Sequence, residues 1–505
     1  MGKNKKNNTI KNNNKKTYDL IFQTTYVVVF CLIGFLLTLY VHDAYYDIME
    51  AKASCFFFIM AFSSPFLVSA FLYRFIINKE NFVSDYFDIG LIILLAVSII
   101  STVLSIDPMM AVSGEEGWKI GSGTIFCLTV LYFTLRRNKI ETKTFFYPLF
   151  VVCEFEFFLT IFDAAGMDLF HFRDVIDNSL YYSYFATIGN SNWNVGYLSL
   201  FVPLFVCLYI KEENTTKKYF YYLLSLSGFL ASILNGADGI YLAYGFCSFF
   251  ILPFFFESLE SLKRTSVLVI GAAASIILVS IISTFDRRLL VLSGYGRILF
   301  DFRCSISLLV LGIAILLFST KANYNKYMLH KTRIIHCLEI FLAICAIGTV
   351  ILAFIGSNGD FGNGRFEIWK ESFDVFKNDY SLLRKLFGVG PELLQHVYGG
   401  LSEKYGVIYN SSHSEPIHML MSMGIMGLLA WCYIWFIIFK TYLNDKKENN
   451  GRGSAIFMGL FAYFGQSFVN SATILNLSTL ALFVIVLSEN TLFCPLKKHN
   501  INHTF

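Results

Sequence analysis

The segment SSHSEPIHMLMSMGIMGLL (Ser411 to Leu429) begins with serines and a histidine and continues as an apolar helical pattern. It closes a polar interval, residues 357–415, that also contains GNGRFEIW (Gly362 to Trp369) and LFGVGPELL (Leu386 to Leu394). This is the one long polar interval in a mostly hydrophobic sequence. A reaction that needs water is therefore most easily placed here, at the start of an apolar helix.

Composition places the chain among membrane proteins. Of its 505 residues, 55% are hydrophobic and only 15% are charged, which is too little polar surface to cover a soluble globule of this size. The apolar runs are long enough to cross a hydrocarbon core of about 30 Å as helices, whereas the strands of a membrane barrel would be short and alternating. The sequence predicts an all-α polytopic integral membrane protein with about 12–14 transmembrane helices.

Fourteen membrane helices are predicted, with the division of residues 219–256 placed at the turn sequence NGADG (Asn235 to Gly239). Their ranges are 19–41, 53–73, 87–105, 122–136, 144–165, 191–210, 219–234, 239–256, 267–284, 304–319, 335–356, 416–439, 454–473 and 476–490.

The distribution of charge predicts the orientation. With the N-terminus in the cytoplasm, cytoplasmic segments carry roughly two thirds of the 40 Lys and Arg residues, as the positive-inside rule expects. The predicted organisation is a basic cytoplasmic tail (1–18), a transmembrane bundle (19–356), an extracytoplasmic loop (357–415), C-terminal transmembrane helices (416–490) and a second cytoplasmic tail (491–505). Most outer basic residues then lie in the long loop and in the preceding one, where they suit an anion.

Arg365 is the first candidate site residue. Phe366, Trp369, Phe373 and Phe376 recur at spacings of three and four, which predicts an amphipathic helix that lies along the membrane surface or caps the bundle. Arg365 would start this helix, where the positive end of the helix dipole adds to its guanidinium in binding phosphate. The alternative is an ion pair of Arg365 with Glu367, Asp360 or another loop carboxylate.

His413 is the second candidate. It lies just before Pro416, so Ser414 or Glu415 is expected to cap the membrane helix and leave the imidazole at the water boundary. There it is expected to titrate near neutrality, as a general base should. A structural role for a single loop histidine is the alternative, and His418 is badly spaced for a metal pair with it.

Two further motifs have both structural and functional interpretations. GNSNWNVG (Gly189 to Gly196) has Asn190 and Asn192 at the start of a helix, where they either cap it or bind sugar hydroxyls. Gly424 and Gly427 are interpreted as a site of close helix packing. The sequence has no P-loop, HExxH, GxSxG or suitably placed DxD motif, so neither a nucleotide cofactor nor a metal is expected, and nothing in the charge pattern indicates nucleic acid.

These motifs, in this order, resemble those of the O-antigen ligase and O-antigen polymerase family of bacterial membrane glycosyltransferases. The resemblance covers about residues 105–435 and is densest over 362–429. The matching positions are Gly189, Asn190 and Asn192, then Gly364, Arg365 and Trp369, then Gly388 and Gly390, and then Ser412, His413, Ser414, Gly424, Ile425, Gly427 and Leu428. Ser414 stands where the family commonly has Asn, Asp238 where it often has Arg, and Lys119 where Arg is frequent.

The resemblance implies a GT-C-like, metal-independent inverting glycosyltransferase of the bacterial cytoplasmic (inner) membrane. Its donor would be a glycan on undecaprenyl pyrophosphate, and its acceptor the hydroxyl of a glycan or lipid-linked glycan at the outer face of the membrane. Arg365 and His413 would be catalytic, and Arg288, Arg297, Asn190, Asn192 and Trp369 would bind substrate. Arg287, Arg288 or Arg297 would replace the missing family arginine.

Two functions from different classes fit the sequence. The first is a lipid-linked oligosaccharide ligase or polymerase, which the pattern does not divide further. The second is a transporter or flippase of lipid-linked glycans, which would have ionisable residues along a path through the bundle. Because the charges cluster in the outer loops, the transferase is favoured.

Overall fold

The computed structural model describes residues 20–137, 143–285, 301–355, 364–406, 408–447 and 451–488. Nearly all regular structure in these residues is helical. The sheet that they contain has two short antiparallel strands, β1 (Tyr184–Phe185) and β2 (Gly189–Asn190). The prediction of an all-α protein is therefore confirmed.

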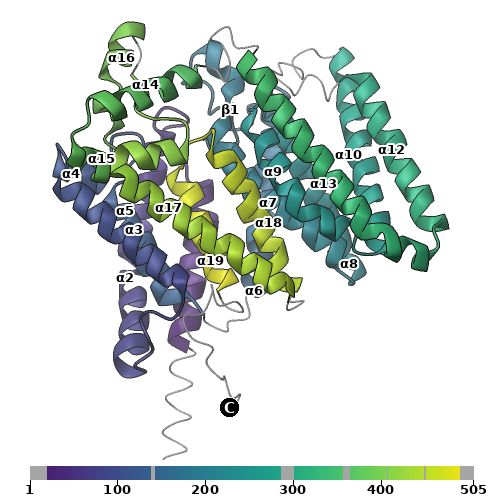
Figure 1. Ribbon diagram of the computed structural model, residues 1–505, viewed down its shortest axis with the longest axis horizontal. Helices are drawn as coiled ribbons and strands as arrows, with labels where there is room; N and C mark the ends of the chain where they lie inside the picture. The colour runs from purple at the N-terminus through teal and green to yellow at the C-terminus, as the bar shows by residue number, and fades with distance from the viewer. Residues whose placement is uncertain are drawn as a thin grey trace, which may run out of the picture.

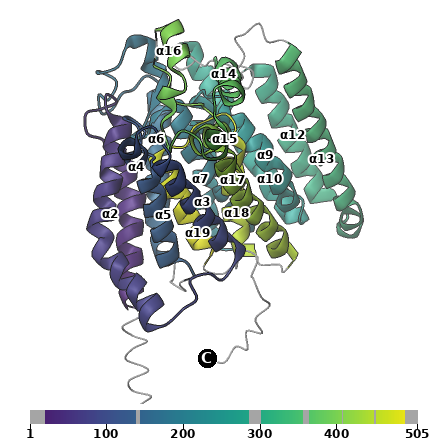
Figure 2. The same ribbon diagram turned by 60° about the vertical axis from the view of Figure 1, so that its left-hand side comes forward.

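Long helices lie side by side in one bundle (Figures 1 and 2). Their bounds are Leu20–Leu37, α2 (Ile48–Leu72), α3 (Tyr86–Val103), α5 (Ser122–Leu135), α6 (Lys143–Ala164), α7 (Ser191–Lys211), α8 (Thr215–Leu234), α9 (Gly239–Phe255), α10 (Leu259–Phe285), α12 (Phe302–Lys321), α13 (Tyr324–Ile355), α17 (Glu415–Lys447), α18 (Gly451–Ser467) and α19 (Ile474–Leu487). The division predicted at NGADG is present, between α8 and α9.

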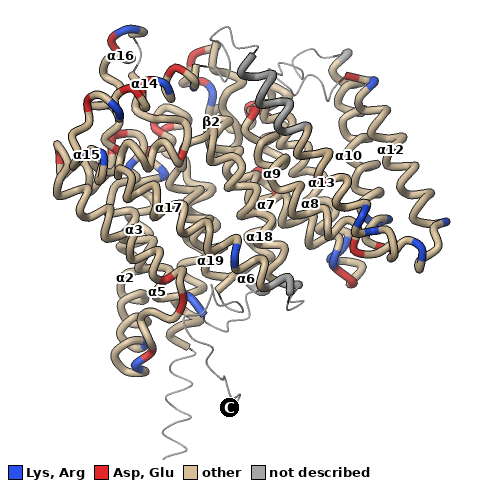
Figure 3. The backbone as a smooth tube through the Cα atoms, viewed as in Figure 1, with Lys and Arg blue, Asp and Glu red and all other residues tan. Residues whose placement is uncertain are grey.

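Length and composition make this chain a multi-pass membrane protein. Seven described helices are long and apolar enough to cross a membrane, namely Leu20–Leu37, Ile48–Ile77, Tyr86–Val103, Ser191–Lys211, Leu259–Ser283, Phe302–Lys321 and Glu415–Asn444. Three shorter apolar helices accompany them, Ser122–Leu135, Gly239–Phe255 and Ile474–Leu487. Figure 3 shows most charged residues at the two ends of the bundle, with a largely uncharged band between them. The count of 12–14 crossings stays a prediction.

The described part of the long loop folds over one end of the bundle, which we call the loop end (Figure 1). It contains α14 (Arg365–Asn378), α15 (Leu382–Phe387), η5 (Leu394–His396) and α16 (Gly399–Tyr405). The loop has a small hydrophobic core shared with α4 (Pro108–Ser113) and α17. Residues of this core include Ala111, Ile368, Leu393, Leu394, Tyr398 and Met421. The loop is thus packed on the bundle rather than extended from it.

The buried face of α14 differs from the predicted aromatic stripe. Phe366 and Phe373 are 43% and 54% exposed, whereas Ile368 and Ser372 are buried. The Ser372 hydroxyl shares a 2.7 Å hydrogen bond with the hydroxyl of Tyr398. Ile368 and Ser372 therefore form the inward face of α14, and the predicted position of this helix along the membrane surface or over the bundle stays a prediction.

Two glycines let α15 approach α17 closely. Gly424 interrupts the α17 helix with a φ of 68°, and a Cβ there would lie 2.3 Å from the carbonyl carbon of Leu386. Gly388 has a φ of 75°, and its Cβ would lie 2.2 Å from the carbonyl oxygen of Ser422. Only glycine combines this conformation with so close a contact. The packing role predicted for Gly424 is therefore present in the structure, where this glycine allows close contact between α17 and the loop.

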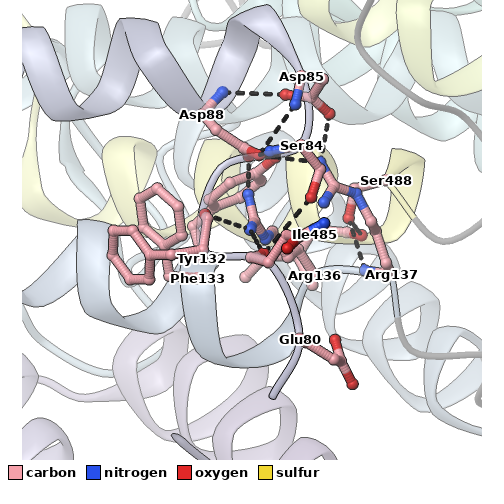
Figure 4. Close-up of polar contacts among 12 residues, drawn as sticks. Glu80, Ser84, Asp85, Asp88, Tyr132, Phe133, Arg136, Arg137, Ile485 and Ser488 are labelled. Carbon is pink, nitrogen blue, oxygen red and sulfur yellow. Dashed lines mark hydrogen bonds and ion pairs between the residues drawn. The ribbon is translucent and has the colours of Figure 1, made fainter. Parts of the chain in front are cut away.

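At the opposite end of the bundle, buried charges join α3, α5 and α19 (Figure 4). Arg136 and Arg137, which follow α5, both form ion pairs with Asp88 in the first turn of α3. The Tyr132 hydroxyl donates to Asp88 Oδ1 at 3.3 Å, and the backbone N–H of Arg137 donates to Ser488 Oγ at 3.1 Å. We call these residues the Asp88–Arg136 cluster. It fixes the three helix ends to one another.

Candidate functional site

Arg365 reaches from the loop into the loop end of the bundle. Gly364, with a φ of 79°, precedes it and allows the chain to turn into α14. The Nη2 atom of Arg365 donates to Asn192 Oδ1 at 2.9 Å and to Asn470 Oδ1 at 3.4 Å. Asn192 lies in the first turn of α7, and Asn470 lies between α18 and α19. The guanidinium therefore lies where the loop meets two widely separated parts of the bundle.

Asn190 and Asn192 of the GNSNWN segment have different roles. Asn190 caps α7, because its Oδ1 accepts the backbone N–H of Asn192 at 2.9 Å. The same oxygen also accepts the side-chain amide of Asn192 at 3.2 Å. Helix capping thus accounts for Asn190, and Asn192 uses its own amide oxygen to hold Arg365. Binding of sugar hydroxyls by either residue stays a prediction.

Arg365 is not in an ion pair with any carboxylate of the described residues. Glu367, one proposed partner, accepts instead from the hydroxyl of Tyr405, and Asp360 lies outside the described residues. Burial lowers the pKa of Arg365 from its usual value, and the Asp238 carboxylate opposes this effect. A half-buried guanidinium whose hydrogen-bond partners among the described residues are amide oxygens retains donors for an incoming anion.

The chain adopts a strained conformation at His413. Its φ of 48° is in the left-handed region, which non-glycine residues seldom occupy except where surrounding contacts impose it. Two contacts do so here: the His413 N–H donates to Ser411 Oγ at 3.2 Å, and Trp369 Nε1 donates to the Ser412 carbonyl at 2.9 Å. Trp369 therefore fixes the segment before His413, and strain of this kind is common at functional sites.

The prediction that His413 titrates near neutrality is wrong. Burial lowers its pKa to about 4, and the positive charge of Arg365 lowers it further in the same direction. The imidazole is consequently neutral at physiological pH, and one ring nitrogen can accept a hydrogen bond. Arg365 is therefore close enough to His413 for its charge to lower the pKa of the imidazole, although 47 residues of chain separate them.

The remaining predicted arginines cannot be placed. Arg287, Arg288 and Arg297 all lie outside the described residues. Asp238 stands at the position where the resemblance expects an arginine. It directly precedes α9, and its negative charge raises the pKa of Arg365.

The sequence analysis missed a second polar group beside the site. His418 Nε2 lies 3.0 Å from Glu392 Oε1, and the ion pair is nearly shielded from water. Glu415, at the start of α17, accepts from Tyr463 Oη at 2.6 Å and from Trp431 Nε1 at 3.3 Å. The carboxylates that stand beside apolar helices in the sequence could have indicated a buried polar group here. No local spacing relates Glu392 to His418, so the sequence could not predict that these two residues pair.

These side chains line a cavity that extends from the site into the bundle. Glu392, Ser411, Glu415, His418 and Ser471 lie at its polar end. Farther along, apolar side chains of α3, α5, α17 and α19 form its walls, among them Leu94, Leu128, Ile434, Leu480 and Val484. The hydroxyls of Ser411 and Ser471 also hydrogen-bond to each other, which places the cavity directly beside the segments that hold His413 and Arg365.

The described residues contain no group of three His, Cys, Asp or Glu side chains placed to hold a metal ion. The fold and this arrangement define an all-α, multi-pass membrane protein with a half-buried arginine and histidine at one end of its bundle. Compared with protein-family models and with curated protein sequences, the chain has no match.

Proposed function

We propose that this protein is a glycosyltransferase of the O-antigen ligase or polymerase type. It transfers a glycan from an undecaprenyl pyrophosphate-linked donor to an acceptor hydroxyl at the outer face of the bacterial cytoplasmic membrane. The observation that carries the proposal is the contact of Arg365 with Asn192 and Asn470 beside a neutral, strained His413. In this proposal the N-terminus is cytoplasmic and the loop end faces outward.

Arg365 is suited to the leaving group. The amide oxygens of Asn192 and Asn470 hold its guanidinium, and Arg365 lies in the first turn of α14, whose N-terminal dipole favours anions. As the bond between the anomeric carbon and the pyrophosphate oxygen breaks, negative charge grows on that oxygen. A fixed and partly dehydrated cation stabilises such charge more than a mobile surface lysine can.

His413 is suited to the acceptor. A neutral imidazole accepts the hydroxyl proton while the acceptor oxygen attacks the anomeric carbon from the side opposite the leaving group, which inverts the configuration there. The charge of Arg365 weakens this base. A bound pyrophosphate offsets that charge, so the pKa of His413 rises when the donor is present and the base becomes effective at the moment it is needed.

A transporter of lipid-linked glycans is the second candidate, because ionisable side chains do occur inside the bundle. Lys52 Nζ donates to the carbonyl of Leu37 at 3.0 Å, and Glu156 accepts from Thr187 Oγ1 at 2.6 Å. Ionisable side chains are therefore present inside the bundle as well as in the outer loops, where the sequence shows them to cluster. Both groups, however, have protein partners that suit a structural role, so the transferase remains the better supported function.

Incubation of the purified protein with lipid pyrophosphate-linked repeat units, with and without a candidate acceptor, tests the proposal. A ladder of products indicates a polymerase, and a single transfer to the acceptor indicates a ligase. Movement of the donor across vesicle membranes without any new glycosidic bond would indicate the transporter instead. The His413→Ala variant serves as the inactive control in each assay.

A further inference from the structure

The cavity beside the site has acidic side chains at its polar end, whereas Arg365 is basic. Its polar end contains the carboxyl groups of Glu392 and Glu415 and the single imidazole of His418. Glu115 lies close enough to Glu392 and His418 for both to shift its pKa. This end of the cavity therefore repels phosphate, whereas the neighbouring guanidinium attracts it.

Two carboxylate oxygens lack a partner in the described part of the chain, one on Glu392 in the cavity lining and one on Glu115 nearby. Glu392 is 5% exposed and Glu115 is 3% exposed, and among the described residues no group donates a hydrogen bond to Glu392 Oε2 or to Glu115 Oε1. An unsatisfied buried carboxylate oxygen is costly. Glu392 also has a φ of 59°, so the chain adopts an unfavourable conformation where it presents this side chain to the cavity. Both observations indicate a ligand that donates hydrogen bonds.

The rest of the cavity suits a hydrocarbon chain. Along α17 its lining extends from His418 to Ile438, a distance of about 30 Å at 1.5 Å per helical residue, which matches the thickness of a hydrocarbon core. Most lining side chains beyond the polar end are apolar. Three of the five tryptophans, Trp118, Trp431 and Trp435, contribute to the walls.

We propose that this cavity binds an amphiphile whose hydrocarbon chain lies among α3, α5, α17 and α19 and whose uncharged, hydroxyl-bearing head group donates hydrogen bonds to Glu392. Hydroxyls supply the donor that the free oxygen of Glu392 needs, whereas a fully ionised phosphate supplies none. Burial raises the pKa of the nearby Glu115 to about 7, and Glu392 is already paired with His418, so this end suits a neutral head group better than a cationic one.

Binding itself does not depend on the proposed transfer. The role of this amphiphile as the acceptor does rest on that function, because its head group would lie beside His413 while the donor pyrophosphate contacts Arg365. Two neighbouring sites of opposite charge would then keep donor and acceptor from exchanging places.

Quenching of tryptophan fluorescence by brominated amphiphiles tests binding in the full-length protein reconstituted into lipid nanodiscs. The probes are dodecyl maltoside, dodecyl phosphate and dodecylammonium, each with two bromines on the alkyl chain. Trp118, Trp431 and Trp435 are at most 9% exposed, so bulk lipid does not reach them. We expect saturable quenching by the maltoside that unbrominated maltoside reverses, and at least tenfold weaker binding of the other two probes.

Two pairs of variants sharpen the test. Ala481→Phe places a ring in the cavity and should abolish saturable quenching, whereas Leu429→Phe on the exposed face of α17 should leave it unchanged. Glu392→Gln should weaken maltoside binding about tenfold and reduce the discrimination against phosphate. Glu403→Gln, which removes an exposed carboxylate on α16, should do neither.

Quenching that only rises linearly, equal or tighter binding of the phosphate or ammonium probe, or full binding by Ala481→Phe would each overturn the proposal. Its failure is distinguishable from failure of the transferase function, because the transfer assay uses other substrates and reports glycosidic bonds. A protein that makes such bonds but does not bind the maltoside probe keeps its proposed function and loses this site.

Discussion

The guanidinium of Arg365 and the amide oxygen of Asn192 lie 2.9 Å apart across 173 residues of sequence. This hydrogen bond joins the first turn of a loop helix to the first turn of a bundle helix. Both helix N-termini therefore point toward the same region, and their dipoles reinforce the positive charge of the arginine there. The predictions on donor binding follow from this arrangement.

Arg365→Lys should weaken donor binding and lower kcat/KM by roughly tenfold or more, although the charge is conserved. Lysine lacks the planar fork that bridges an amide and two phosphate oxygens, and a loss of about 1.4 kcal/mol is a factor of ten. Donor binding and initial rates of transfer measure the effect. Arg384→Lys, at an exposed position on α15, is the matched control. Parental behaviour of Arg365→Lys would contradict the role in bidentate binding.

His413→Ala should leave the dissociation constant of the donor nearly unchanged and slow transfer by roughly 10² to 10⁴, the usual contribution of a general base. Rates under saturating donor, with insertion and folding compared with the parent, check this result. His396→Ala removes an exposed imidazole from the same loop and should be neutral. If His413→Ala transfers at the parental rate, the residue is structural.

The pH dependence of transfer should differ between kcat/KM and kcat. The former reports the free enzyme, where the pKa of His413 is about 4, so activity is lost only as the pH falls through that value. The latter reports the donor complex, where the pyrophosphate offsets Arg365, so its acidic limb should lie at higher pH. Coincident limbs in the two profiles would show that the donor does not approach this histidine.

The orientation of the loop end can be measured by cysteine labelling in a background without native cysteines. A cysteine replacing Lys404 on α16 should react with a membrane-impermeant maleimide added outside intact cells. A cysteine replacing Lys326, in the first turn of α13, should react only after the membrane is made permeable. The reverse result would place the site in the cytoplasm and exclude a donor on the outer face.

Transfer should need no divalent metal, since the charge on the leaving group is met by guanidinium groups. Activity in excess EDTA should equal activity in Mg²⁺ or Mn²⁺. Loss of activity in EDTA and recovery with either metal would assign the stabilising role to an ion instead of Arg365.

The sequence predicts helices well because hydrophobic length and turn signals are local properties. The turn at residues 235–239 and the start of α14 at Arg365 both follow from neighbouring residues. The environment of His413 does not, because its low pKa depends on burial by distant segments and on the charge of Arg365. The pairing of Glu392 with His418 is likewise invisible, since it depends on how α15 crosses α17 at Gly424.

The Asp88–Arg136 cluster determines how molecules can leave the cavity. Phe87 and Tyr132 line the cavity at its far end, and the Tyr132 hydroxyl contacts Asp88, whose ion pair with Arg136 is wholly shielded from water. Separating two such charges without new partners is expensive. A path out of the cavity past this cluster would require those charges to separate. The cluster therefore acts as a barrier behind Phe87 and Tyr132, and it holds together the helix ends on which the cavity wall depends.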